Sequence, residues 1–149
     1  MADIDLKLTN TNGFDIAIEN GVFLYENTYR SHIITSLFEN QRLDQALAKN
    51  KPYHMRGGSP AEILLNYDGF KRGSLLWTLL YKATVNLDLI NKVQTKSETA
   101  LQWLVENKYI KSLTVEVESV DAKSIKIKVN IVNNDNATQE EIFTNISTS

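Results

Sequence analysis

The stretch "SLTVEVESVDAKSIKIKVNIVNN", residues Ser112–Asn134, alternates apolar and polar side chains almost without interruption. Successive side chains of a strand point to opposite faces, so Leu113, Val115 and Val117 fall on one face. The pattern folds back around residues 119–123 and then repeats, with an apolar face formed by Ile125, Ile127, Val129 and Ile131. This stretch therefore predicts a β-hairpin with one apolar face.

Opposite charges lie on the polar face of the predicted hairpin. Glu116 and Glu118 alternate on its first strand, and Lys126 and Lys128 alternate on its second. Each cross-strand pair of this kind contributes roughly 0.2–1 kcal/mol. A lone hairpin is marginal in water, so this one needs further strands or a covering helix.

The edges of this hairpin carry neither proline nor glycine, the residues that often prevent further strand pairing. Lys126 and Lys128 could discourage unwanted pairing, and they would also suit a partner strand that carries carboxylates. We therefore predict that a strand from another chain partly completes the sheet. Two intramolecular alternatives remain open, namely the N-terminal hairpin and the tail "EEIFTNIS" (residues 140–147).

A second hairpin is predicted near the N-terminus, after an alternating start at Ile4, Leu6 and Leu8. In "GFDIAIENGVFLYEN" (residues 13–27), the dipeptide Asn20-Gly21 separates two apolar runs. Asn-Gly is the strongest short hairpin signal, because both positions of the turn need a positive φ.

Between these ends the apolar period becomes helical. Tyr29, Ile33 and Leu37 recur every four residues, as do Ile34 and Phe38, which predicts an amphipathic helix from Thr28 to near Arg42. Residues 43–50 fit a short helix. The stretches "KPYHMRGGSPAEI" (residues 51–63) and "YDGFKRGS" (residues 67–74) are predicted loops, because prolines or glycines interrupt them.

A central, nearly all-apolar helix is predicted in "LLWTLLYKAT" (residues 75–84), with Ser74 as its N-cap. "NLDLINKVQ" (residues 86–94) continues as a helical segment. Thr95 and Glu98 then have the spacing of a capping box, which predicts either a new turn or a fresh helix. The order of strands, helices and strands is typical of an α+β domain.

Length and composition favour one domain over residues 1–149, of which 42% are hydrophobic. The net charge of -2 argues against a nucleic-acid partner, because phosphate binding relies on clustered Lys and Arg. We also expect no membrane insertion and no signal peptide. The absence of cysteine excludes disulfides and fits a reducing cytoplasm.

Candidate catalytic and metal-binding groups are sparse. His32 and His54 are the only histidines, so no His-rich metal site is expected, and His32 is interpreted as a surface or helix-packing residue. A possible basic patch (Lys51, His54, Arg56, Lys71, Arg72) is interpreted as solvated loop charges. Nothing marks an acid and nucleophile pair among Glu39, Glu62, Asp68, Glu98 and Glu106. Trp77 and Trp103 are interpreted as core or interface residues rather than the walls of a sugar cleft. We expect no cofactor and no enzymatic activity.

Four spaced stretches carry a family resemblance. They are "SLFENQR" (residues 36–42), "RGGSP" (residues 56–60), "GSLLWTLLYKAT" (residues 73–84) and "ALQWLVENKYIKSLTVEV" (residues 100–117). In this order they resemble the Mu-type baseplate wedge family of contractile phage tails, across about residues 3–132. That family is similar to the sheath initiators, a group often labelled lysozyme-like. One departure is Gly58-Ser59-Pro60-Ala61, which stands where the family has a Trp-Trp-Gly-Asp type stretch.

The resemblance implies a structural protein of a tail baseplate, made in the host bacterial cytoplasm and present in about six copies per particle. Its implied partners are other wedge proteins, the central hub or tube, and the tail sheath. Whether the particle is a phage, a bacteriocin or another tail-like device stays open. An edge-strand adaptor module is the alternative function, followed by a peptidoglycan-cleaving enzyme.

Candidate interface residues follow from the resemblance and from the alternating strands. The first group surrounds the strongest motif matches, where we expect Arg42 to make the specific contact through its planar guanidinium. The second group is the apolar pattern of the predicted sheet. The full set is Leu37, Phe38, Arg42, Gly73, Ser74, Trp77, Val115, Val117, Ile125, Ile127, Val129 and Ile131.

Overall fold

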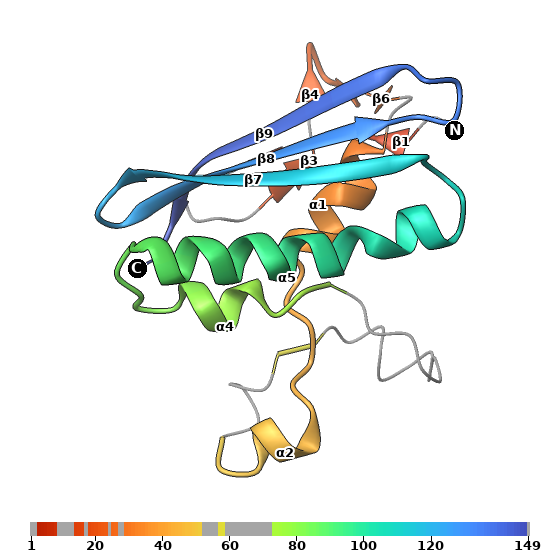
Figure 1. Cartoon of the computed structure of the whole chain (residues 1–149). Coiled ribbons are helices and arrows are strands. Elements are labelled where there is room, and N and C mark those ends of the chain that lie inside the picture. The colour runs from red at the N-terminus through yellow and green to blue at the C-terminus, as the bar shows by residue number, and fades with distance from the viewer. Residues whose placement is uncertain are drawn as a thin grey trace.

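The computed structural model describes residues 3–8, 14–16, 18–23, 25–26, 29–51, 57–58 and 73–148. Short strands come first, helices follow, and a long antiparallel sheet ends the chain (Figure 1). The predicted α+β class is therefore confirmed. Most of the two predicted loops lies outside the described residues, as do His54, Arg56, Glu62, Asp68, Lys71 and Arg72.

Three antiparallel strands form the C-terminal sheet, in the order β7-β8-β9. They are β7 (Ser112–Asp121), β8 (Ser124–Val132) and β9 (Thr138–Ser147). The predicted hairpin is confirmed, with Val115 paired to Val129 and Val117 paired to Ile127. A register shift at Val120 precedes the turn.

The tail is a long strand that pairs with β8 along nearly its whole length. Strand β8 therefore lies between two strands of its own chain. The expectation that Lys126 and Lys128 guard an open edge is wrong, because both residues lie on this central strand. The tail, one of the two intramolecular alternatives, therefore completes the sheet beside β8. The outer sides of β7 and β9 pair with no further strand among the described residues.

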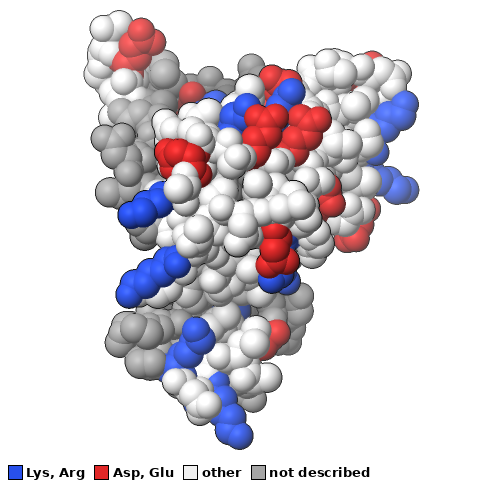
Figure 2. All heavy atoms as spheres, turned by 60° about the vertical axis from the view of Figure 1, so that its left-hand side comes forward, with Lys and Arg blue, Asp and Glu red and all other residues white. Residues whose placement is uncertain are grey.

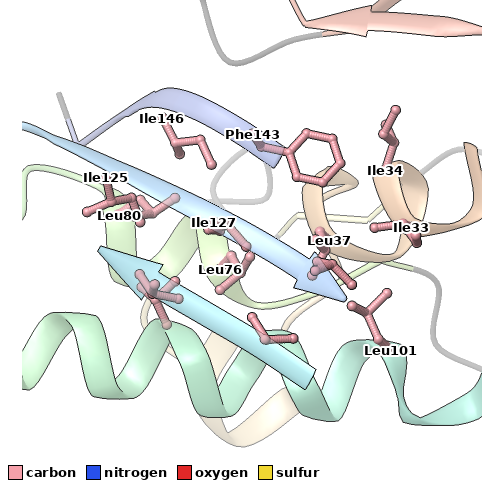
Figure 3. Close-up of a cluster of buried hydrophobic side chains, with 14 of the residues drawn as sticks. Ile33, Ile34, Leu37, Leu76, Leu80, Leu101, Ile125, Ile127, Phe143 and Ile146 are labelled. Atoms are coloured by element: carbon pink, nitrogen blue, oxygen red, sulfur yellow. The ribbon is translucent and has the colours of Figure 1, made fainter. Parts of the chain in front are cut away.

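Helices α1 (Arg30–Phe38), α4 (Leu76–Leu80) and α5 (Leu87–Glu106) pack on one face of this sheet, where the main apolar core lies (Figure 3). Ile33, Leu101 and Ile127 are each fully buried there. Burying one such side chain contributes about 1.5–3 kcal/mol relative to leaving it exposed. Helix α5 lies along β7, and α1 reaches β9, where the ring centroids of Phe38 and Phe143 are 5.3 Å apart. The apolar face of the sheet is thus buried by helices of the same chain.

Helix α1 (Arg30–Phe38) ends four residues before the predicted Arg42. The backbone becomes extended at Glu39, whose N–H still donates to the Thr35 carbonyl oxygen. Asn40 then forms a parallel bridge with Ser74. The apolar periodicity of the sequence could not locate this helix end, because a backbone contact with a distant segment ends the helix and leaves no sign in that periodicity.

The middle helices differ in length from those predicted. The predicted short helix is confirmed as α2 (Gln45–Ala48). Helix α4 (Leu76–Leu80) is much shorter than the central helix expected over residues 75–84, and Tyr81 after it is 66% exposed. The Ser74 hydroxyl does accept from a first-turn amide, that of Leu76, although Leu75 occupies the cap position.

The central helix is instead α5 (Leu87–Glu106), which runs for 20 residues without a break. Asn86 caps it, because its Oδ1 accepts the Leu89 N–H at 2.8 Å. The predicted capping box is wrong, since the Thr95 hydroxyl donates to the Asn91 carbonyl oxygen inside the helix. No described helix is long and apolar enough to cross a membrane.

Ser97 is a polar residue on the buried face of α5. It is fully buried, and its Oγ has no hydrogen-bond partner among the described residues. We expect Ser97→Ala to raise the free energy of unfolding by about 1 kcal/mol, because it removes an unsatisfied buried hydroxyl. Urea unfolding measures this change.

Ser36 provides a matched control for Ser97. Ser36 is also buried, but its Oγ accepts the indole N–H of Trp103 at 3.0 Å. We expect Ser36→Ala to lower the free energy of unfolding by about 1 kcal/mol. Equal destabilisation by both alanine variants would contradict the assignment of Ser97 as unsatisfied.

The N-terminal strands form three small antiparallel pairs, β1–β6, β2–β3 and β4–β5. Their bounds are β1 (Asp3–Ile4), β2 (Leu6–Leu8), β3 (Phe14–Ile16), β4 (Ile18–Glu19), β5 (Val22–Phe23) and β6 (Tyr25–Glu26). The predicted hairpin is confirmed at Asn20 and Gly21, whose φ values are +51° and +76°. These signs are the ones that a type I′ turn requires.

Candidate functional site

Three segments that lie far apart in the sequence meet through their backbones. Residues 39–41 follow α1, residues 57–58 come from the glycine-rich stretch, and residues 73–77 lead into α4. The Ser74 N–H donates to the Glu39 carbonyl at 2.9 Å, and the Gln41 N–H donates to the Ser74 carbonyl at 3.0 Å. We call these three segments the junction.

Gly57 and Gly58 fit closely against the other two segments of the junction. The Gly58 N–H donates to the Asn40 carbonyl at 2.8 Å. A Cβ on Gly57, whose φ is +68°, would lie 2.6 Å from the Gln41 carbonyl oxygen and 2.9 Å from the Trp77 ring. The Trp77 indole N–H donates to that same Gln41 oxygen at 3.2 Å. Close packing against Gln41 and Trp77 thus explains the first glycine of the family motif "RGGSP".

Ser74 links the end of α1 to the start of α4. Its buried hydroxyl donates to the Leu37 carbonyl and accepts the Leu76 N–H at 3.2 Å. Gly73 before it has a φ of +81°, and a Cβ there would overlap the Glu39 carbonyl. The motif "GSLLW" therefore has the small residues that this contact requires.

Two hollows flank the junction. A groove of about 550 Å³ lies between α1 and α5, and it gathers residues from three of the four family stretches. Its described lining is His32, Thr35, Ser36, Gln41, Gly73, Ser74, Leu75, Lys96, Thr99, Ala100 and Trp103. A smaller hollow of about 250 Å³ includes Leu37, Phe38 and Trp77.

The structure brings together only part of the predicted interface set. Phe38 and Trp77 are half-buried at the smaller hollow, and Arg42 is half-buried just beyond the junction. Leu37 is buried in the core. The strand residues lie beneath the sheet, in contact with this chain's own helices, and they are Val115, Val117, Ile125, Ile127, Val129 and Ile131. A partner at the sheet would therefore meet backbone edges or solvent-facing side chains.

His32 packs against two aromatic rings, which agrees with the helix-packing role, one of the two that the sequence left open. Its ring lies 6.2 Å from the Tyr29 ring and 6.1 Å from the Trp103 ring, centroid to centroid. Within the described ranges, no group of three or more His, Cys, Asp or Glu side chains is placed to hold a metal ion. Glu98 and Glu106 line a shallow groove with Trp103 on α5. They are eight residues apart, about 12 Å along the helix axis.

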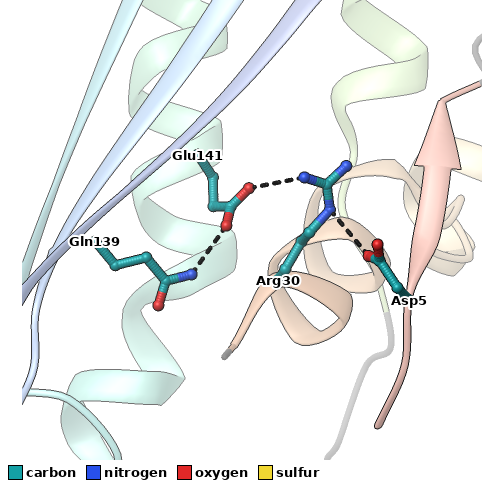
Figure 4. A network of polar contacts seen from close by, with 4 residues as sticks. All are labelled: Asp5, Arg30, Gln139 and Glu141. Atoms are coloured by element: carbon teal, nitrogen blue, oxygen red, sulfur yellow. Dashed lines mark hydrogen bonds and ion pairs between the residues drawn. The ribbon is translucent and has the colours of Figure 1, made fainter. Parts of the chain in front are cut away.

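Arg30 makes a link that the sequence did not indicate. Its guanidinium lies 3.3 Å from the Asp5 carboxylate and 3.2 Å from that of Glu141 (Figure 4). Glu141 also accepts a hydrogen bond from the Gln139 amide at 3.0 Å. This network joins the N-terminal strands, α1 and β9. A single arginine at a helix start has no sequence pattern that predicts such partners.

Charges on the solvent face of the sheet are paired across strands. Lys126 lies against Glu118, and Lys128 lies 3.6 Å from Glu116 and 3.1 Å from Glu140. The hydrogen bond and positive charge of Lys126 lower the pKa of Glu118, while the hydrogen bond and charge of Glu140 raise the pKa of Lys128. On the face in Figure 2, acidic and basic side chains of the described residues are interspersed, without a continuous basic stripe.

Comparison with known proteins identifies the family of this chain. A curated relative, the Mu-like prophage FluMu protein gp46 of Haemophilus influenzae, is 28% identical over 145 residues, which cover 96% of each chain. No solved structure matches the chain. The family model described as "Phage protein GP46" matches residues 29–138, from the start of α1 to the first residue of β9. Because that match spans well over half of the sequence, the chain belongs to the phage protein GP46 family.

Proposed function

We propose that this protein is a structural component of the baseplate of a contractile phage tail or tail-like particle. The observation that carries the proposal is the junction, where three of the stretches that resemble the baseplate wedge family meet. A contact made of backbone hydrogen bonds and tightly fitted glycines explains those motifs through architecture, without any catalytic group. Membership of a phage protein family supports this role.

In this role the chain joins wedge proteins to the central hub or tube and provides a strand edge for the sheath. About six copies surround the tail axis in a closed ring, as the family resemblance implies. The protein is made in the host cytoplasm and then becomes part of the tail. No strand among the described residues pairs with the outer side of β7, which supports strand pairing as the mode of attachment.

Deletion of the gene from an inducible particle tests this proposal. We expect tubes, sheath subunits and heads to be made, while complete baseplates and assembled sheaths are lost. Electron microscopy and mass spectrometry of purified particles measure both outcomes, and supplying the gene from a plasmid should restore assembly. Contractile tails of normal number and composition in the deletion would refute the role.

We expect Arg42→Ala to reduce the number of assembled baseplates at least severalfold while the protein stays folded. Arg42 is half-buried beside the junction, and its planar guanidinium suits a carboxylate or backbone carbonyls of a partner. Particle counts by electron microscopy measure the effect. The control is Lys49→Ala, an exposed cation nearby in the sequence, which should assemble normally. Normal baseplate numbers with Arg42→Ala would exclude this contact.

An adaptor module outside tails is the second candidate function, and the open β7 edge is the observation that favours it. In that case the purified protein would capture a specific peptide or protein that is no tail component. Assembly only with other tail proteins favours the baseplate role instead.

We also propose that the protein has no peptidoglycan hydrolase activity. Glu98 and Glu106 share a groove with Trp103, but both lie on the same helix, about 12 Å apart along its axis, rather than on either side of a sugar cleft. We expect purified protein to release no sugar from peptidoglycan. Turnover that disappears in Glu98→Gln or Glu106→Gln, and persists in Glu116→Gln, would reverse this conclusion.

A further inference from the structure

The two outer strands of the C-terminal sheet have different edges. Strand β9 carries a register shift, a positive φ of +56° at Asn145, and an inward carboxylate at Glu141 that Arg30 holds (Figure 4). Bulges and inward charges are devices that blunt strand edges. Strand β7 has only the irregularity at Val120, next to its turn. Residues 113–119 of β7 thus form a regular edge that no other described strand pairs with.

The solvent face of this edge is acidic. Glu116 and Glu118 point outward from β7, with side chains that are 58% and 62% exposed. The lysines that neutralise them lie on the inner side, on β8. Lys128 is shared with Glu140 and lies closer to Glu140 than to Glu116. A strand added outside β7 would bring its own side chains opposite both glutamates, and basic residues there would continue the alternation of charge across the sheet.

On the other face of the sheet, helix α5 runs along β7. Ala100 and Trp103 face α1 across the large groove, and α1 packs toward β9. The flank of α5 that points away from α1 therefore lies on the β7 side. Figure 1 shows α5 running along β7, and helical spacing tells which residues of α5 lie on that flank. That flank carries half-buried Ile90 and Val105 and the 72% exposed Leu87.

We propose that the outer edge of β7 binds an extended partner strand with Lys or Arg at every second position and apolar side chains between them. Its backbone pairs with residues 113–119, its basic side chains face Glu116 and Glu118, and its apolar side chains cover the α5 flank. This inference rests on the proposed function, because it identifies the partner of the same sheet. It replaces the expectation of a carboxylate-bearing partner, since the lysines lie on the central strand and the glutamates at the edge.

The first test uses synthetic peptides and amide NMR of the full chain. The probe is the N-acetylated peptide TVKVRVKVT, and its matched counterparts are the acidic peptide TVEVEVEVT and the proline-containing TVKPRVKVT. We expect only the first to bind at concentrations up to about 1 mM, with shifts and slowed hydrogen exchange concentrated in β7. Binding should weaken as salt increases.

Variants locate the contact. Glu116→Gln combined with Glu118→Gln should weaken peptide binding about tenfold and leave the fold intact, because exposed ion pairs contribute little to stability. The matched control is Glu140→Gln, which removes a carboxylate from the same sheet face on the other outer strand. It should bind the peptide as the parent chain does.

The results separate this inference from the proposed function. Peptide shifts centred on β9, equal binding of the acidic peptide, or no binding of the basic peptide would each overturn the β7 assignment. In particles, the double glutamine variant should still enter baseplates while sheath assembly falls. Normal sheath assembly in that variant overturns the edge assignment alone, whereas absence of the parent chain from baseplates overturns the role itself.

Discussion

Gly73→Ala is expected to lower the free energy of unfolding by about 3 kcal/mol, among the largest effects of any single substitution in this chain. Gly73 has a φ of +81°, which strains any other residue type, and its Cβ would overlap the Glu39 carbonyl. That carbonyl already accepts the Ser74 N–H, so the backbone cannot move without breaking the junction. Chemical denaturation of the purified variant measures the loss.

Gly21→Ala is the matched control for this prediction. Gly21 has nearly the same φ, +76°, but a Cβ there meets nothing within 4 Å. The control therefore carries backbone strain alone, and we expect a loss of about 1 kcal/mol. The difference between the two variants isolates the close contact with Glu39. Equal losses would show that the junction tolerates a side chain at position 73.

Val129→Pro is expected to unfold the C-terminal sheet, with a loss of more than about 3 kcal/mol. Val129 is fully buried on β8, with Val115 of β7 on one side and Glu141 of β9 on the other. Proline removes a ladder donor and is tolerated in sheets only at edges or bulges. Circular dichroism and thermal unfolding measure the effect.

Val120→Pro is the control, because Val120 lies at the register shift of β7 and is 48% exposed. We expect it to cost much less than Val129→Pro. A folded Val129→Pro protein would contradict the central position of β8. Because β8 is the central strand, a proline at Ile127 or Val129 would unfold the protein and could not test whether an edge of the sheet is open.

Much of the strand architecture was predictable from local patterns. The alternation in Ser112–Asn134 predicted both strands and their buried face, because a period of two fits only a half-buried strand. Asn20-Gly21 predicted its turn, because few residue pairs accept two positive φ values. The charge pairs of β7 with β8 also followed from the register that this alternation imposes.

Helix lengths were less predictable, because tertiary contacts set them. Helix α1 stops at Phe38, where bonding of Glu39 and Gln41 to Ser74 replaces the next helical turn. Helix α5 runs through the apparent capping box at Thr95–Glu98, because its buried face continues on both sides of it. Local signals of this kind contribute about 1 kcal/mol, less than the burial of one large apolar side chain.

By itself, the sequence determined the α+β class, the pairing of β7 with β8 and the resemblance to a phage family, because each can be read from local patterns and motifs in their order along the chain. Only the tertiary structure decided which strand is central, which edge stays open and why Gly57 and Gly73 are glycines. These features depend on contacts between segments tens of residues apart. Their geometry is fixed by the shared core and by backbone hydrogen bonds, which leave no periodic signal in the sequence.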